Sequence, residues 1–165
     1  MARGLYSHAE GKETKALDSG THTEGAYTVA SAPFAHAEGN TTSALGGSSH
    51  AEGKETKTLE VGAHAEGGGT TASGEYAHAE GSNTTASGSA AHAEGRNNLA
   101  GGKYSHAEGE ETIAYGYRSH AEGNKTVAKG GYSHAEGYSK DVPNDIMPDL
   151  NKDTPFEDIL TAWTN

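Results

Sequence analysis

The sequence contains no cysteine, so neither disulfide bonds nor thiolate metal sites can form. Hydrophobic residues make up only 32% of its 165 positions. No run of them approaches the roughly 20 apolar residues of a membrane-spanning helix. Residues 1–5 also lack the apolar segment of a secretion signal. We therefore expect no signal peptide in the chain as given, no anchor and no membrane insertion.

Positive charge is scarce as well, with 12 Lys and Arg against 23 Asp and Glu and a formal net charge of −11. Ten of the acids are glutamates of the repeat described next, and without them 13 acids face 12 bases. The acidity is thus almost entirely a property of the repeat. Nucleic acid is not an expected partner, because a surface that binds it would be basic.

A 14-residue repeat runs through most of the chain. All ten histidines lie in one register, and each is followed by a glutamate two positions later and a glycine three positions later. The histidines are His8, His22, His36, His50, His64, His78, His92, His106, His120 and His134, and the glutamates are Glu10, Glu24, Glu38, Glu52, Glu66, Glu80, Glu94, Glu108, Glu122 and Glu136. A fixed period of this kind is typical of stacked repeat proteins and argues against the disorder that the composition alone would suggest.

Each repeat holds two stretches in which small residues alternate with larger ones, a strand pattern. Residues 77–90 are the clearest example, reading Ala-His-Ala-Glu-Gly-Ser-Asn-Thr-Thr-Ala-Ser-Gly-Ser-Ala. The small set, including the glycines, is expected to face inward, with Ser and Thr hydroxyls bonded between adjacent coils. The other set includes Lys15, Leu17 and Tyr115, so it is expected to face outward. The pattern predicts an all-β parallel β-roll (β-solenoid) over residues 1–137, with two five-residue strands in each of ten coils.

An inward set of small residues places the histidines and glutamates on the outside of the roll. Parallel coils about 4.8 Å apart would then stack the ten glutamates into a like-charge ladder beside the histidines. A core of Ala, Gly and Thr buries little apolar area. Both difficulties are relieved if this face packs against copies of itself, with His of one chain bonded to Glu of the next. The sequence thus predicts an obligate homo-oligomer.

The repeat Ser-His-Ala-Glu-Gly-x-x-Thr-x-Ala-x-Gly-x-x resembles the head repeat of the YadA-like trimeric autotransporter adhesins, Ser-Val-Ala-Ile-Gly-x-x-Ser-x-Ala-x-Gly-x-x. The likeness covers residues 5–137. The sequence is also similar to Ser-His-Ala-Glu-Gly repeats in phage and prophage tail fibres. The resemblance implies a left-handed roll, a homotrimer, and His and Glu in the Val and Ile places along the three-fold axis. It also implies an extracellular location, on a bacterial surface or a virion.

Residues 138–165 depart from the repeat and form a second segment. Thr154 can cap a helix that has Pro155 at its first position and Glu157 at its third. One apolar stripe follows at helical spacing, comprising Phe156, Ile159, Leu160 and Trp163. This pattern predicts a short helical cap over the last coil. The alternative is the start of a neck or coiled coil, or a docking peptide for a following domain.

The expected function is that of a non-enzymatic structural or adhesive fibre segment. A site repeated ten times on an interface lacks the concave pocket of an enzyme, so neither catalytic residues nor a cofactor is expected. The expected partners are the chain itself and a host-surface glycan or protein. Aromatic residues two positions before histidine could contact that partner or shield the turns, namely Tyr6, Phe34, Tyr76, Tyr104 and Tyr132.

A metal-binding protein is the alternative function. Three imidazoles in each layer around a three-fold axis, with carboxylates beside them, could hold a divalent transition metal. In that case the ten histidines of the repeat are the candidate ligands and the ten glutamates their axial partners. Without metal, the same residues would form an interchain hydrogen-bond network.

Overall fold

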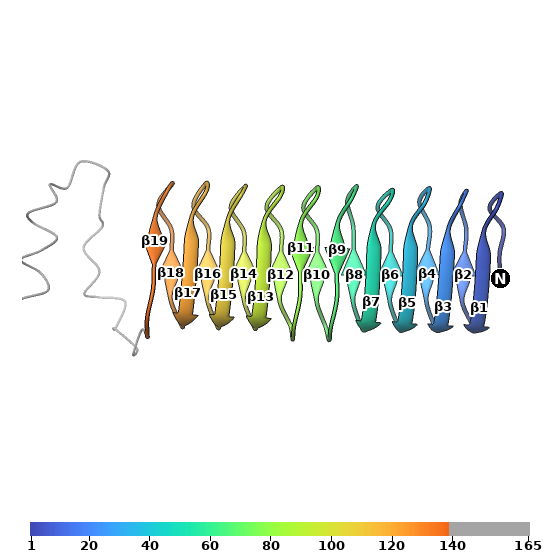
Figure 1. Ribbon diagram of the computed structural model, residues 1–165, viewed down its shortest axis with the longest axis horizontal. Coiled ribbons are helices and arrows are strands. Elements are labelled where there is room, and N and C mark those ends of the chain that lie inside the picture. Colours follow the sequence, from blue (N-terminus) through green and yellow to red (C-terminus); the bar gives the residue numbers. More distant parts are fainter. Residues whose placement is uncertain (139–165) are drawn as a thin grey trace, which may run out of the picture.

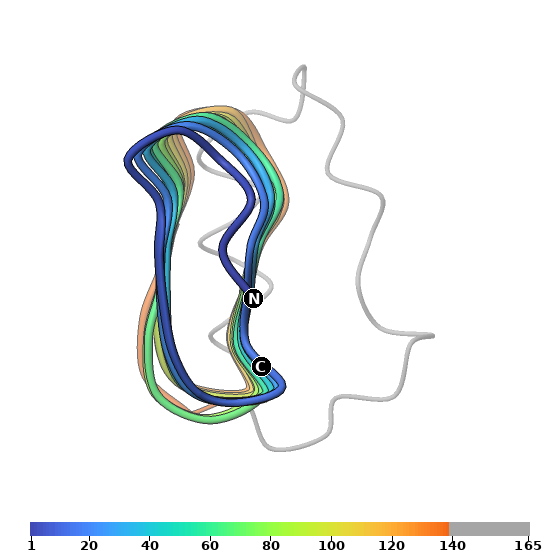
Figure 2. The same ribbon diagram turned by 90° about the vertical axis from the view of Figure 1, so that its right-hand side faces the viewer.

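The computed structural model describes residues 1–138, which form a parallel β-solenoid of about nine turns stacked along one axis (Figure 1). Viewed along the stack, successive turns superpose as one flattened loop (Figure 2). Residues 1–138 contain no helix, and hence none that is long and apolar enough to cross a membrane. The predicted all-β solenoid is confirmed. The helix predicted from Thr154 lies outside the described residues.

Two parallel sheets form the walls of the solenoid, and their strands are counted here within residues 1–138. The histidine sheet has ten strands, each of which begins at a repeat histidine: β1 (His8–Lys12), β3 (His22–Ala26), β5 (His36–Asn40), β7 (His50–Lys54), β9 (His64–Ala65), β11 (His78–Ala79), β13 (His92–Arg96), β15 (His106–Glu110), β17 (His120–Asn124) and β19 (His134–Ala135). Its register pairs each histidine with the next, as in His92↔His106. Every turn therefore contains 14 residues.

The second sheet has nine strands of two residues each: β2 (Lys15–Ala16), β4 (Val29–Ala30), β6 (Ser43–Ala44), β8 (Lys57–Thr58), β10 (Thr71–Ala72), β12 (Thr85–Ala86), β14 (Leu99–Ala100), β16 (Ile113–Ala114) and β18 (Val127–Ala128). The prediction of two five-residue strands per coil is wrong for this sheet, and it is also wrong for β9, β11 and β19 of the histidine sheet, which have two residues each. Left-handed residues such as Asn83 (φ 54°) and Ala90 (φ 51°) bend the chain on both sides of the second sheet. The predicted tenth coil would need a strand beyond Tyr138, outside the described residues.

The predicted assignment of inner and outer faces is confirmed, except for the glycine that follows each glutamate. Ala79 and Ala93 of the histidine sheet and Thr84 beside the second sheet are fully buried. Leu17 and Tyr115, on the outer face of the second sheet, are exposed. The core between the sheets consists of Ala, Thr and Ser, with Asn98 as the largest buried side chain. Such a core has no room for larger side chains.

The sequence predicted hydroxyl bonds between adjacent coils, but within residues 1–138 the hydrogen bonds of the inward hydroxyls stay within one turn. Ser49 Oγ donates to the carbonyl oxygen of Gly46 in its own turn at 2.7 Å, and Ser105 Oγ does the same to Gly102. The Oγ1 of Thr58 reaches Ser49 Oγ at 2.8 Å, across the core. Equivalent hydroxyls of adjacent coils lie about 4.8 Å apart, beyond hydrogen-bond reach. Several core threonine hydroxyls, including those of Thr28, Thr42 and Thr70, have no hydrogen-bond partner among the described residues.

The glycine after each glutamate is required by the backbone and not by the core. Gly67 has φ 100° and Gly81 has φ 97°, values that side chains rarely tolerate. A Cβ on Gly67 would also collide with the carbonyl oxygen of Gly81 in the next turn. The prediction that this glycine belongs to the inward set is therefore corrected: it permits a positive φ and close stacking of turns.

Candidate functional site: the His–Glu face

The outer surface of the histidine sheet, here called the His–Glu face, carries all ten repeat histidines and all ten repeat glutamates. Ring centroids of adjacent histidines from His22 to His134 lie 4.7–4.9 Å apart, with ring planes within 15° of parallel. His8 meets His22 edge-on instead, at 81°. In-register parallel strands place identical side chains one above the next at the spacing of the turns. The sequence repeat thus becomes a column of stacked imidazoles.

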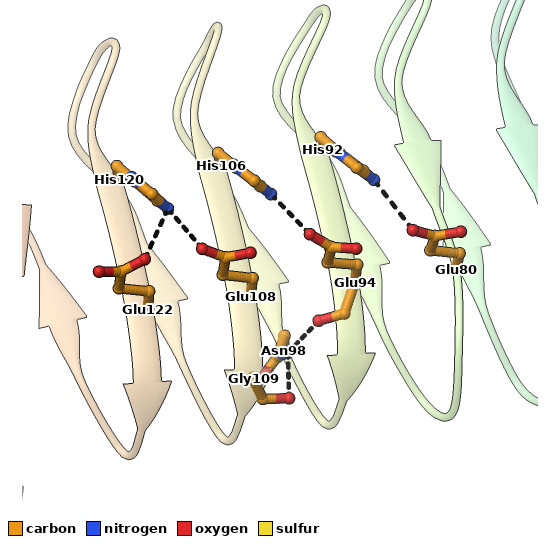
Figure 3. Close-up of polar contacts among 9 residues, drawn as sticks. All are labelled: Glu80, His92, Glu94, Asn98, His106, Glu108, Gly109, His120 and Glu122. Carbon is orange, nitrogen blue, oxygen red and sulfur yellow. Dashed lines mark hydrogen bonds and ion pairs between the residues drawn. The ribbon is translucent and has the colours of Figure 1, made fainter. Parts of the chain in front are cut away.

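Many histidines lean toward the glutamate of the preceding turn (Figure 3). His106 Nε2 donates to Glu94 Oε1 at 3.3 Å, and His120 Nε2 donates to Glu108 Oε1 at 3.2 Å. His92 Nε2 is 3.5 Å from the nearer oxygen of Glu80. The sequence analysis predicts His–Glu pairs between chains, and it did not predict these pairs between adjacent turns of one chain.

Nearer the N-terminus the pairs lie within a single turn. His36 Nε2 is 3.5 Å from Glu38, and His50 Nε2 is 3.6 Å from Glu52. These distances are too long for good hydrogen bonds. Five covered Nε2 atoms have no hydrogen-bond partner among the described residues, those of His36, His50, His64, His78 and His92. The face therefore contains nitrogen atoms that residues 1–138 leave without a hydrogen-bond partner.

The glutamates line an open groove of about 570 Å³ beside the histidines, formed by Glu38, Glu52, Glu66, Glu80, Glu94 and the glycines next to them. Contact with the carboxylate of Glu66, partial burial and contact with Glu94 raise the pKa of Glu80 to about 7. Contact with Glu80 lowers the pKa of Glu66 and of Glu94. Neighbouring carboxylates thus share protons in preference to ionising together.

The imidazoles are biased toward their neutral form. Burial, followed by repulsion from adjacent imidazoles, lowers the pKa of His50 and His78. The same two causes, in the same order, lower the pKa of His36 and His92. A neutral imidazole has one nitrogen lone pair free, which is the form that binds metals.

The structure brings some of the predicted metal ligands together in groups of three. Two groups contain two histidines, namely His92–Glu94–His106 and His120–Glu122–His134, and three contain one, namely Glu38–His50–Glu52, Glu52–His64–Glu66 and Glu66–His78–Glu80. Within each group, one ligand atom from every residue lies within 4.8 Å of the others. None of these groups, drawn from the described part of the chain, includes His8, His22 or His36.

A second cluster lies at the turn that precedes the histidine sheet, here called the aromatic edge and defined by Tyr104, Tyr117, Arg118 and Tyr132. The guanidinium of Arg118 lies 5.0–5.8 Å from the centres of the three tyrosine rings. Tyr117 meets Tyr104 and Tyr132 edge-on, at 5.9 and 5.5 Å. The sequence predicted Tyr104 and Tyr132. Arg118 was missed, although it occupies the same repeat position, two before histidine.

Other aromatic residues of this repeat position shield the backbone. A Cβ on Gly20 would meet the ring of Phe34, and one on Gly62 would meet the ring of Tyr76. Each ring therefore covers the glycine one turn earlier. The two roles predicted for the aromatic positions are therefore both compatible with the structure: Phe34 and Tyr76 shield turns, and an exposed cluster around Arg118 could contact a partner.

The sequence matches no protein-family model, and no curated protein is significantly similar to it. Functional inference therefore depends on the geometry of the His–Glu face and the aromatic edge.

Proposed function

We propose that this chain is a non-enzymatic segment of a fibre, in which three left-handed rolls pack their His–Glu faces around a common axis. The observation that carries the proposal is the set of unpartnered Nε2 atoms from His36 to His92. Buried polar atoms without partners are costly, and the same face of a second chain would bring carboxylates within their reach. In this arrangement the glutamates hydrogen-bond between chains.

The small core supports the same proposal. Its apolar residues are all alanines, and alanine buries little area per residue. A solenoid of this kind gains stability when one wall is covered by another chain. About nine turns at roughly 4.8 Å each give a straight shaft on the order of 40–50 Å long. A rigid rod of this kind suits a structural or adhesive appendage of a bacterial surface or a virion.

The aromatic edge supports the adhesive part of the proposal. Tyr132 is 71% exposed, and Tyr104 and Tyr117 are 46% and 40% exposed. Exposed tyrosines beside an arginine are typical of surfaces that contact glycans or proteins. The edge lies at a turn and not on the His–Glu face, so trimer formation would leave it accessible to a host-surface partner.

Sedimentation analysis of the full chain at micromolar concentration tests the assembly. We expect three chains per particle. The double variant His78→Ala/His92→Ala should weaken the trimer, because it removes the imidazoles nearest Glu66 and Glu80 and leaves these carboxylates unpaired in a confined space. The matched control Lys57→Ala/Thr85→Ala alters the outer face of the second sheet and should keep three chains. A folded, soluble monomer of the unaltered chain would contradict the proposal.

A further inference from the structure

Two places on the His–Glu face hold one glutamate between the histidines of adjacent turns. Glu122 faces His120 and His134, with N–O distances of 3.9 and 3.7 Å through different carboxylate oxygens. Glu94 lies 3.3 Å from His106, and it shares a group with His92, whose Nε2 has no hydrogen-bond partner among the described residues. The three groups that hold a single histidine lack this arrangement.

The spacing of these atoms fits a coordinated ion. Bonds of about 2.0–2.2 Å to a tetrahedral zinc ion place two ligand atoms about 3.4 Å apart. The nitrogen–oxygen distances of 3.3–3.9 Å are within about half an ångström of that value. An ion between the His106 nitrogen and the Glu94 oxygen would take the place of the hydrogen-bond proton. Little movement of the carboxylate is required.

The two histidines of each group must move closer together. Their ring centroids are 4.8 Å apart, whereas two nitrogens on one tetrahedral zinc ion are about 3.4 Å apart. Metal binding therefore requires the Nε2 ends of the two rings to tilt toward each other. The side chains of His106 and Glu94 are each 35% exposed, so water can fill the remaining coordination positions.

We propose that each chain binds two divalent late transition-metal ions, one at His92–Glu94–His106 and one at His120–Glu122–His134. Two imidazole nitrogens and one carboxylate favour Zn²⁺ or Ni²⁺ over Mg²⁺ and Ca²⁺, which prefer oxygen ligands alone. The sites lie within one chain, between adjacent turns. An ion on a three-fold axis, by contrast, would be shared by three chains, each of which supplies one of its ligands. The proposal does not require a trimer.

Metal analysis of the full chain, purified without a polyhistidine tag, tests the proposal. The protein is stripped with a chelator, dialysed against micromolar ZnCl₂ and assayed for bound zinc. We expect two zinc ions per chain. His106→Gln and His134→Gln should each retain one ion, and the double variant should retain none. His22→Gln is the matched control, because His22 stacks in the same column but belongs to no group of candidate ligands.

Circular dichroism shows whether each variant keeps its fold, and Glu94→Gln replaces His106→Gln if the latter unfolds. A stoichiometry other than two per chain overturns the proposal, and one ion shared by three chains would indicate axial binding instead. Equal zinc content in His134→Gln and His22→Gln also overturns it. So does calcium binding at the same stoichiometry, which would indicate a general acidic groove.

Discussion

At the scale of single residues, the interior of the roll accepts only very small side chains. Ala79 and Ala93 are fully buried in the histidine sheet, and the rest of the described core consists of alanine, threonine and serine, with Asn98. The width of the core is therefore set by the smallest side chains that can fill it, and each inner position has the same limit.

Replacing an inner alanine by leucine should destabilise the protein. We expect Ala79→Leu to cost about 1–3 kcal/mol or more, since a core of this width has little freedom to relax. The matched control is Thr85→Leu, a similar enlargement on the outer face of the second sheet, which should leave the melting temperature almost unchanged. Circular dichroism melting of the two variants provides the comparison. Equal losses in both variants would mean that the overpacking argument is wrong.

Glu80 should make stability depend on pH in a particular direction. Contact with Glu66 raises its pKa from 4.5 to about 7, so the folded protein holds the proton more tightly than the unfolded chain does. This contribution to stability is present below pH 4.5 and is lost as the pH rises through about 7. The uncharged variant Glu80→Gln should therefore melt higher than the unaltered protein at pH 8, with a smaller difference at pH 5.

The variant and the unaltered protein contain the same histidines, so the difference between their melting temperatures at each pH reports the contribution of Glu80. The lowered pKa of His50 and His78 acts in the opposite direction, because stability is lost as the pH falls below 6.5. A Glu80→Gln variant with a lower melting temperature than the unaltered protein at pH 8 would show that the charge on Glu80 stabilises the fold.

At the scale of one element, the exit from each strand of the histidine sheet depends on a single glycine. Gly67 has a positive φ and lies against the backbone of the next turn, whereas its neighbour Gly68 has no atom within 4 Å of where a Cβ would stand. Two adjacent glycines in the same turn therefore have different structural requirements.

This contrast provides a matched pair of variants. Gly67→Ala should lower stability by about 1–3 kcal/mol from backbone strain alone, with the collision against Gly81 in addition. Gly68→Ala should be neutral or slightly stabilising, because alanine restricts the unfolded chain more than glycine does. Urea denaturation of both variants measures the difference. Similar midpoints for the two would contradict the role given to the glycine that follows each glutamate.

The sequence predicted the elements on the histidine sheet better than those on the second sheet. The ten histidines begin the ten strands, because small residues alternate on both sides of each one. The second sheet has only two residues per strand. The residues that flank it in the left-handed conformation include Asn83 and Ala90, and amino-acid composition does not reveal that conformation. The shift that places His106 beside Glu94 was also not predicted, since it depends on how side chains lean between turns.

At the scale of the whole molecule, charge and aromatic character are unevenly distributed along the shaft. Arg118 and Lys103 lie over the rings of the aromatic edge, near the last turns of the described chain. Toward the opposite end, Lys12 lies over the ring of Tyr27, while Tyr6, at the same repeat position as Arg118, is 89% exposed and has no cation–aromatic contact among the described residues. The two ends should therefore differ in what they bind.

Removal of the aromatic edge should weaken attachment without affecting assembly. We expect the triple variant Tyr104→Ala/Arg118→Ala/Tyr132→Ala to lose about tenfold or more in affinity for a surface glycan or protein, since each aromatic or cationic contact contributes about 0.5–1 kcal/mol. Tyr6→Ala is the control. Screening against immobilised glycans and host-surface proteins identifies a binder for the comparison. An equal loss in the control would place the contact elsewhere on the rod.

Because the sheets pair in register, the number of repeats, and with it the length of the solenoid, can change by mutation. Each strand pairs only with strands of the turns before and after it, in the same register throughout. Deleting or duplicating 14 codons by unequal recombination would therefore join two strands that already fit, and the product would differ by one step in length. The length of the shaft can therefore change by whole repeats while the contacts between neighbouring turns stay the same.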